Sequence, residues 1–245
     1  MHSRALLALT VAALVLGGCG SKSSTPAETA GSVSTEATTA TTTTETATAT
    51  TPTPAPAPST GCTKVSAPAP KADGGQTKPT GTLDPGKTYT VTIKTNCGSF
   101  TIEVDQKTSP HVAASFIALA RSGFFNGTTF HRIVPGFVIQ GGDPTGSGSG
   151  GPGYSTRDVP PSDAQYTQGV VAMAKTGAEA PGTSGSQFYV VTGADAGLPP
   201  EYALLGKVTK GLGVTAKIDK LGDPASGGTG TPLQAVVIEK ATVGS

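Results

Sequence analysis

The sequence predicts a mainly β protein with two short helices, in which the strands form a closed antiparallel barrel. The second half of the chain contains many short runs of strand character, and only two runs have the apolar spacing of a helix. A regular alternation of strands and helices would indicate an α/β sheet instead. The strand pattern by itself leaves a β-sandwich open as the alternative to a barrel.

The folded part begins with a predicted hairpin followed by a helix. Apolar and polar residues alternate over residues 89–95 and again over residues 100–104, and Asn96-Cys97-Gly98 between them supplies turn residues. Ser109-Pro110 then places an N-cap residue before a proline at the first helical position, and Gly123 ends the helix.

The remaining elements follow from the same patterns. A glycine-rich loop is expected at residues 141–153, and a second, shorter helix at residues 213–220. Strands are expected at residues 129–134, 137–140, 170–174, 187–191, 204–208 and 236–239.

The N-terminus has the features of an export signal. Residues 1–18 join a short basic region to an apolar run that is too short to span a membrane, which needs about 20 residues. The small residues before Cys19 resemble the lipobox of bacterial lipoproteins, so we expect Cys19 to be lipidated. Two or more acyl chains there would anchor the protein to the outer face of the cell membrane.

Composition divides the rest of the chain into a tether and one domain. Residues 19–85 are rich in Thr, Ala and Pro and have almost no large apolar side chains, so we expect a disordered tether. Residues 86–245 are sufficient for a single folded domain. The net charge of +1, from 17 basic and 16 acidic residues, argues against nucleic acid as a partner.

The cysteines predict one disulfide. Without Cys19, the chain has an even pair, Cys62 and Cys97, in a compartment where disulfides persist. We therefore expect these two residues to be bonded. The three histidines, one of them in the signal segment, are too scattered to form a metal site, and we expect neither a metal nor a cofactor.

Two motifs indicate the function. The run from Phe130 to Asp143, FHRIVPGFVIQGGD, resembles the signature of the cyclophilins, which are peptidyl-prolyl cis/trans isomerases. A second matching run, GSQFYV, extends from Gly185 to Val190. The resemblance covers about residues 87–243 and implies a closed eight-stranded antiparallel barrel with a helix over each end. Its expected partners are proline-containing segments of exported proteins during folding, and we expect a monomer.

The resemblance also implies the site. Arg132 matches the catalytic arginine of the family, and the expected substrate-binding residues are Phe137, Val138, Gln140, Ala174, Lys175, Gln187, Tyr189, Leu198 and Tyr202. An arginine suits the chemistry because twisting the X–Pro amide leaves a lone pair on the prolyl nitrogen, which a fixed cationic donor stabilises. No proton is transferred, so His131 is not expected to take part.

Several positions depart from the family pattern. Lys175-Thr176 replaces a usual Asn-Ala, Val138 replaces a larger wall residue, and Tyr189 replaces a Phe, which should add a hydroxyl to the pocket rim. The departures at Lys175, Thr176 and Val138, together with Gly197 where vertebrate members of the family have a Trp, leave one alternative open: a non-catalytic peptide-binding or chaperone module tethered to the cell envelope. The presence of Arg132 favours catalysis.

Overall fold

The computed structural model describes residues 61–245. The expected signal peptide at residues 1–18, the expected lipidation site Cys19 and the tether up to residue 60 lie outside the described residues.

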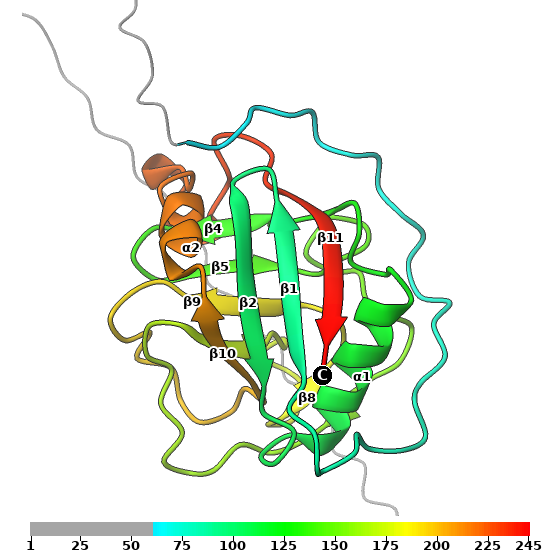
Figure 1. The fold of residues 1–245 in the computed structure, drawn as a ribbon. Helices are drawn as coiled ribbons and strands as arrows, with labels where there is room; N and C mark the ends of the chain where they lie inside the picture. The colour runs from blue at the N-terminus through cyan, green and yellow to red at the C-terminus, as the bar shows by residue number, and fades with distance from the viewer. Residues whose placement is uncertain (1–60) are drawn as a thin grey trace, which may run out of the picture. The chain divides into compact units, whose positions relative to one another are not determined.

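A curled sheet of nine strands forms the body of the domain (Figure 1). Its spatial order is β3-β11-β1-β2-β10-β7-β9-β5-β4, and every neighbouring pair is antiparallel. The strands are β1 (Thr90–Thr95), β2 (Gly98–Val104), β3 (Thr128–Thr129), β4 (Arg132–Val134), β5 (Val138–Gly141), β7 (Val170–Met173), β9 (Phe188–Val191), β10 (Leu204–Lys210) and β11 (Val237–Gly244). A separate two-stranded sheet pairs β6 (Thr156–Arg157) with β8 (Thr183–Ser184).

The prediction of a closed eight-stranded barrel is wrong in this structure, which has an open, half-barrel sheet of nine strands. The two edge strands, β3 and β4, come from one run of chain that was expected to be a single strand. Its start pairs with β11 and its end pairs with β5. The two edge strands are therefore connected only by the chain itself, through Phe130 and His131. In a closed barrel, the edge strands would be hydrogen-bonded to each other.

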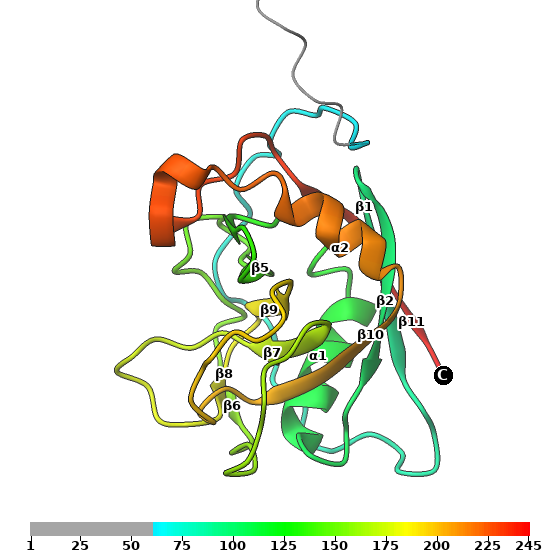
Figure 2. The same cartoon turned by 90° about the vertical axis from the view of Figure 1, so that its left-hand side faces the viewer.

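Two α-helices lie toward opposite ends of the curled sheet (Figure 2). α1 (Pro110–Arg121) contacts β11 and β6, whereas α2 (Leu212–Asp219) contacts β2, β4 and β5. A short 3₁₀ segment, η1 (Pro224–Thr229), follows α2 and contacts β4. No helix within residues 61–245 combines the length and the apolar character that crossing a membrane would require.

The N-terminus of α1 is capped differently from the prediction. Ser109 precedes the helix but makes no side-chain cap hydrogen bond. Instead, the carboxylate of Asp158 accepts hydrogen bonds from the backbone N–H of Val112 and from the His111 ring, both at 2.7 Å. Because a carboxylate at a helix N-terminus also complements the helix dipole, this distant residue replaces the local cap.

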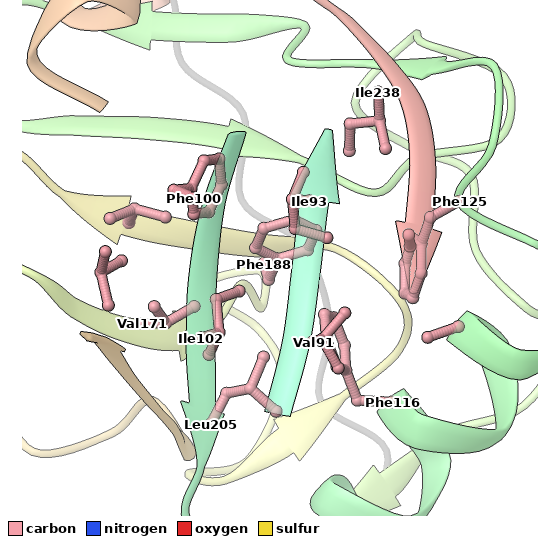
Figure 3. Packing of buried hydrophobic residues seen from close by; sticks show 14 of the residues in the cluster. Val91, Ile93, Phe100, Ile102, Phe116, Phe125, Val171, Phe188, Leu205 and Ile238 are labelled. Carbon is pink, nitrogen blue, oxygen red and sulfur yellow. The ribbon is translucent and has the colours of Figure 1, made fainter. Parts of the chain in front are cut away.

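The hydrophobic core fills the concave side of the sheet (Figure 3). Alternate residues of β1 and β2 point into it, including Val91, Ile93, Phe100 and Ile102, and each is at most 1% exposed. Phe188 of β9 makes edge-to-face contacts with rings from α1 and from the segment that follows it. The alternation of apolar and polar residues along the hairpin therefore places its apolar side chains on the face that packs into the core.

Residues 61–86 lie against the domain as an extended segment, which we call the strap (Figure 1, cyan). The strap comprises the last part of the segment that was expected to be a tether, residues 61–85, together with residue 86. The strap is held by backbone hydrogen bonds that composition does not predict: Thr63 donates to Asn96, and Lys71 to Pro144. The ammonium of Lys71 also donates to the backbone oxygens of Phe124 and Asn126.

The start of the strap is covalently fixed to the hairpin. Cys62 is bonded to Cys97, which is 3% exposed in the turn between β1 and β2. This is the pairing that the cysteine count predicts. The disulfide, together with the hydrogen bonds, accounts for an ordered strap that has few buried apolar side chains.

Candidate active site

One cavity of about 280 Å³ gathers nearly all of the expected site residues. Its lining consists of Arg132, Phe137, Val138, Gln140, Ala174, Lys175, Tyr189, Leu198 and Tyr202. Only Gln187 among the expected residues is absent from this lining, and it borders a neighbouring cavity instead. The antiparallel pairing of β4, β5 and β9 brings Arg132, Gln140 and Tyr189 into register across three adjacent strands.

The apolar wall of the cavity is one face of a small hydrophobic cluster. The buried members of this cluster include Val138, Tyr189 and Val191, and Phe137 and Leu198 pack against it. A side chain such as a prolyl ring would therefore contact a preformed apolar surface that is rigid because it rests on a packed core.

Backbone and side-chain acceptors hold the guanidinium of Arg132 in place. Nε and Nη2 donate to the carbonyl oxygen of Gly228 at 3.2 and 3.0 Å, and Nη1 donates to Oε1 of Gln140 at 3.4 Å. Because a guanidinium has five N–H donors, two remain available to a ligand. Its carbon lies 5.8 Å from the centroid of the Phe137 ring, so a group that rests on this ring would meet the cation.

A chain of amide hydrogen bonds connects Arg132 to the glycine-rich loop. Gln140, which accepts from Arg132, donates to Oε1 of Gln187 at 3.0 Å. Gln187 in turn donates to the carbonyl oxygens of Gly148 and Gly150. Gln187 therefore holds the side chain of Gln140 in place and does not line the cavity of Arg132.

The glycine-rich loop is organised by one buried carboxylate. Asp143 is fully buried and accepts hydrogen bonds from the backbone N–H groups of Thr145, Gly148 and Gly150 and from the Thr145 hydroxyl. Burial raises the pKa of Asp143, but these hydrogen bonds together lower the pKa by more, below its ordinary value. The ionised carboxylate thus fixes the loop whose carbonyls hold Gln187.

The floor of the cavity is fixed by a residue that the sequence did not indicate. The carboxylate of Asp219, at the end of α2, accepts from the backbone N–H of Gly136 at 3.0 Å and from the hydroxyl of Thr192 at 2.6 Å. Phe137 lies between these two points, since Thr192 also donates its backbone N–H to the carbonyl oxygen of Phe137. α2 therefore positions the aromatic ring without contacting the cavity.

Tyr189 and Tyr202 form the remaining wall, and the ring of Tyr166 packs against both of them. The hydroxyl of Tyr166 donates to the carbonyl oxygen of Tyr202 and accepts from the backbone N–H of the same residue, and the Tyr189 and Tyr202 rings meet edge to face. The expected hydroxyl at the pocket rim is not found, because the Tyr189 oxygen is buried and has no hydrogen-bond partner within residues 61–245. Burial raises the pKa of Tyr189, so this hydroxyl stays protonated.

Lys175 is built into the wall and is not free to contact a ligand with its charge. Its side chain is 2% exposed, and the ammonium lies 2.9 Å from the Glu201 carboxylate and 5.4 Å from the centroid of the Tyr202 ring. It also donates to the backbone oxygens of Thr176 and Glu179. Lys175 therefore ties the loop after β7 to the tyrosine wall.

Two cations line the cavity, and within residues 61–245 Lys175 is paired with a carboxylate whereas Arg132 is not. Burial lowers the pKa of Arg132, and Tyr202 raises it, but the ordinary value is so high that the guanidinium stays charged at neutral pH. Burial also lowers the pKa of His131, so this ring is neutral at neutral pH. Within residues 61–245, no group of three or more His, Cys, Asp or Glu side chains could hold a metal ion.

Sequence reasoning missed Gly228, Tyr166 and Asp219, each of which holds a site residue in place. Gly228 contributes only a carbonyl oxygen, which leaves no signal in the side-chain pattern. Tyr166 and Asp219 act through hydrogen bonds over 36 and 83 residues, which no local motif could reveal.

Comparisons with known proteins match this region of the chain. Residues 90–243 match the family described as "Cyclophilin type peptidyl-prolyl cis-trans isomerase/CLD". A peptidyl-prolyl cis-trans isomerase of Helicobacter pylori is 39% identical over 155 residues, covering 58% of this chain and 93% of its own. A probable peptidyl-prolyl cis-trans isomerase A of Mycobacterium bovis is 35% identical over 178 residues, covering 66% of this chain and 96% of its own.

Solved structures give the same result. A cyclophilin-type isomerase of Cryptosporidium parvum has a TM-score of 0.58 and 32% identity, and the match covers 65% of this chain and 99% of the other. The structure of the same protein in the presence of the dipeptide Ala-Pro matches with a TM-score of 0.57 and 31% identity, covering 64% of this chain and 99% of that one.

Proposed function

Since this chain belongs to the family of cyclophilin-type peptidyl-prolyl cis-trans isomerases, we propose that it accelerates X–Pro rotation in exported proteins with Arg132 as the catalytic residue. The chain is an enzyme of this type, and proline-containing peptides fit it as substrates because Ala-Pro was present in the structure of a relative. The role of Arg132 and the identity of the clients go beyond family membership.

One observation carries the proposal for Arg132: two free guanidinium N–H donors lie at the edge of an apolar cavity with an aromatic floor. A prolyl ring on Phe137 would bring its nitrogen beside these donors. The amide barrier of about 18–20 kcal/mol comes from resonance in the C–N bond, which is lost as the bond twists. A cationic donor aimed at the nitrogen stabilises the twisted amide more than either planar form, and this difference lowers the barrier.

The hydrogen bonds around Arg132 fit this role. Gly228 and Gln140 fix the guanidinium before the substrate arrives, so little reorganisation is needed during the reaction. Because no proton is transferred during the rotation, the mechanism needs no general base, and His131 has no role in it.

The test is an isomerisation assay on a proline peptide with the Arg132→Ala variant. We expect kcat/KM to fall by about 10²–10³-fold, the range for loss of one preorganised donor. Arg132→Lys keeps the charge but loses the fork of donors, and we expect only partial activity. Arg121→Ala is the matched control, because Arg121 lies on α1 over the Tyr89 ring and lines neither this cavity nor its neighbour.

The outcomes separate catalysis from binding alone. Full activity of a folded Arg132→Ala protein would refute the mechanism. An inactive wild-type protein that still binds proline peptides would favour the tethered, non-catalytic chaperone module.

We also propose that the protein is exported and anchored to the outer face of the cell membrane. The basic and apolar segments of residues 1–18 and the small residues before Cys19 support this location. Export is also compatible with the Cys62–Cys97 disulfide, since such bonds persist outside the reducing cytosol. Mass spectrometry of the protein from membranes tests the anchor: diacylated Cys19 as the first residue supports it, and an uncleaved Met1 contradicts it.

A further inference from the structure

A second cavity of about 450 Å³ adjoins the proposed proline cavity. The two share three lining residues, Gln140, Ala174 and Lys175, so they form one continuous groove. An extended peptide advances about 3.3 Å per residue. Because the two cavities share lining residues, a peptide with its proline in the first would place the side chain of a nearby residue in the second.

The strap forms part of the wall of this second cavity. Gly74 and Gln76 donate their backbone N–H groups to the carbonyl oxygens of Gly151 and Pro152, and Gly151 donates back to Oδ1 of Asp73 at 2.8 Å. These contacts bring the carboxylate of Asp73 to the lining. The strap precedes residues 90–243, which match the family, so this wall is a feature that family membership does not supply.

The charges that line this cavity are unbalanced. Its charged lining residues are Asp73, Glu179 and Lys175. The ammonium of Lys175 is paired with Glu201, which lies outside the lining, and donates its other hydrogen bonds to backbone oxygens. Lys175 is thus already neutralised, and the two lining carboxylates remain.

Each of these two carboxylates is held in position by hydrogen bonds from neighbouring groups. Gly151 fixes Oδ1 of Asp73, and the backbone N–H and hydroxyl of Thr176 both donate to Oε2 of Glu179. The strap and the loop after β7 thus each present one positioned carboxylate to the groove, and either carboxylate can accept hydrogen bonds from a cationic side chain of a bound peptide.

We propose that the second cavity is a subsite for a lysine or arginine side chain near the proline of the substrate, and that the strap belongs to the substrate-binding groove. This inference rests on the proposed isomerase function of the adjoining cavity. It implies that clients are selected partly by a basic residue close to the isomerised bond.

The test uses peptides with a single proline, in which Ala, Lys or Glu occupies in turn each of the three positions on either side. The cis/trans exchange rate of each peptide is measured by NMR in the presence of the purified protein. At one position we expect Lys to raise kcat/KM about twofold to fivefold over Ala, as for a solvent-exposed ion pair, and Glu to lower it. Added salt should reduce this preference.

Substitutions that remove a carboxylate charge but keep the size of the side chain separate the effect of charge from an effect on folding. Asp73→Asn keeps an oxygen for the N–H of Gly151 but loses the charge, and it should reduce the Lys preference, measured as the ratio of kcat/KM for the Lys peptide to that for the Ala peptide. Asp73→Asn combined with Glu179→Gln should abolish the preference. Asp163→Asn removes an exposed carboxylate that does not line the groove, and should leave the preference intact.

Failure of this inference is distinguishable from failure of the isomerase proposal. Turnover of the Ala peptides with no Lys preference at any position overturns the subsite and leaves the isomerase intact. A Lys preference that survives the double substitution also overturns the subsite. Absence of turnover for every peptide refutes the isomerase activity on which the subsite depends.

Discussion

The disulfide between Cys62 and Cys97 should hold the strap in place more than it holds the sheet together. The bond closes a loop with a sequence separation of 35 residues. By loop-closure entropy, a cross-link over about 35 residues restricts the unfolded chain by about 4 kcal/mol at 25 °C. This value is an upper limit on the loss of stability when the bond is removed, because a strap that detaches regains conformational entropy in the folded protein.

The perturbation is a double substitution, Cys62→Ala with Cys97→Ala. We expect the free energy of unfolding in urea to fall by less than about 4 kcal/mol. The amides of Gly74 and Gln76, which donate to the glycine-rich loop, should exchange with solvent much faster, whereas that of Val91 in β1 should stay protected.

Hydrogen exchange is the decisive measurement, because it separates loss of the strap from loss of the whole domain. Wild-type protein under reducing conditions is the control and should behave like the variant. Wild-type exchange rates at Gly74 and Gln76 in the folded variant would refute the reasoning, since they would show that the strap is held by its own contacts.

Three further predictions concern single residues of the site. Tyr189→Phe should raise the free energy of unfolding by about 1 kcal/mol in a denaturant titration, because it removes a buried hydroxyl without a hydrogen-bond partner in residues 61–245; a loss of stability would contradict this. Asp219→Ala should lower kcat/KM about tenfold in the isomerase assay, because the turn at Gly136 and the Phe137 ring lose their support; unchanged kinetics would show that the ring keeps its place without α2. Asp143 has a lowered pKa in the folded state, so its contribution to stability is present above the unfolded pKa of about 4 and is lost as the pH falls through the lower folded value. Asp143→Asn should therefore be less stable at pH 7 and lack this acid-dependent part in unfolding curves from pH 7 to 2, and a pH profile parallel to wild type would count against it.

The elements that the sequence predicted well are those whose signals are local. The hairpin of β1 and β2 follows from a period-two pattern, and α1 follows from a proline at its first position and a glycine beyond its last. The cap of α1 was not predicted correctly, because Asp158 lies 46 residues along the chain from Val112, the residue whose backbone N–H donates to its carboxylate. β6 and β8 have two residues each, too few to show any period.

The residues of the site also differ in how far a local sequence signal predicted them. Arg132 and Phe137 lie in one continuous motif, and the structure places both at one cavity. Lys175 shows the limit of motif reasoning, because its position in the groove was expected but the direction of its charge toward Glu201 was not.

The sequence by itself therefore determined the mainly β class, the two helices, the paired cysteines and the residues that gather around Arg132, since each depends on a local pattern, a composition or a contiguous motif. Only the tertiary structure decided that the sheet stays open, that Gly228 holds the guanidinium, and that the strap walls a second cavity. The physical reason is that these features depend on backbone hydrogen bonds between segments far apart in the chain, and backbone groups are the same at every residue except proline.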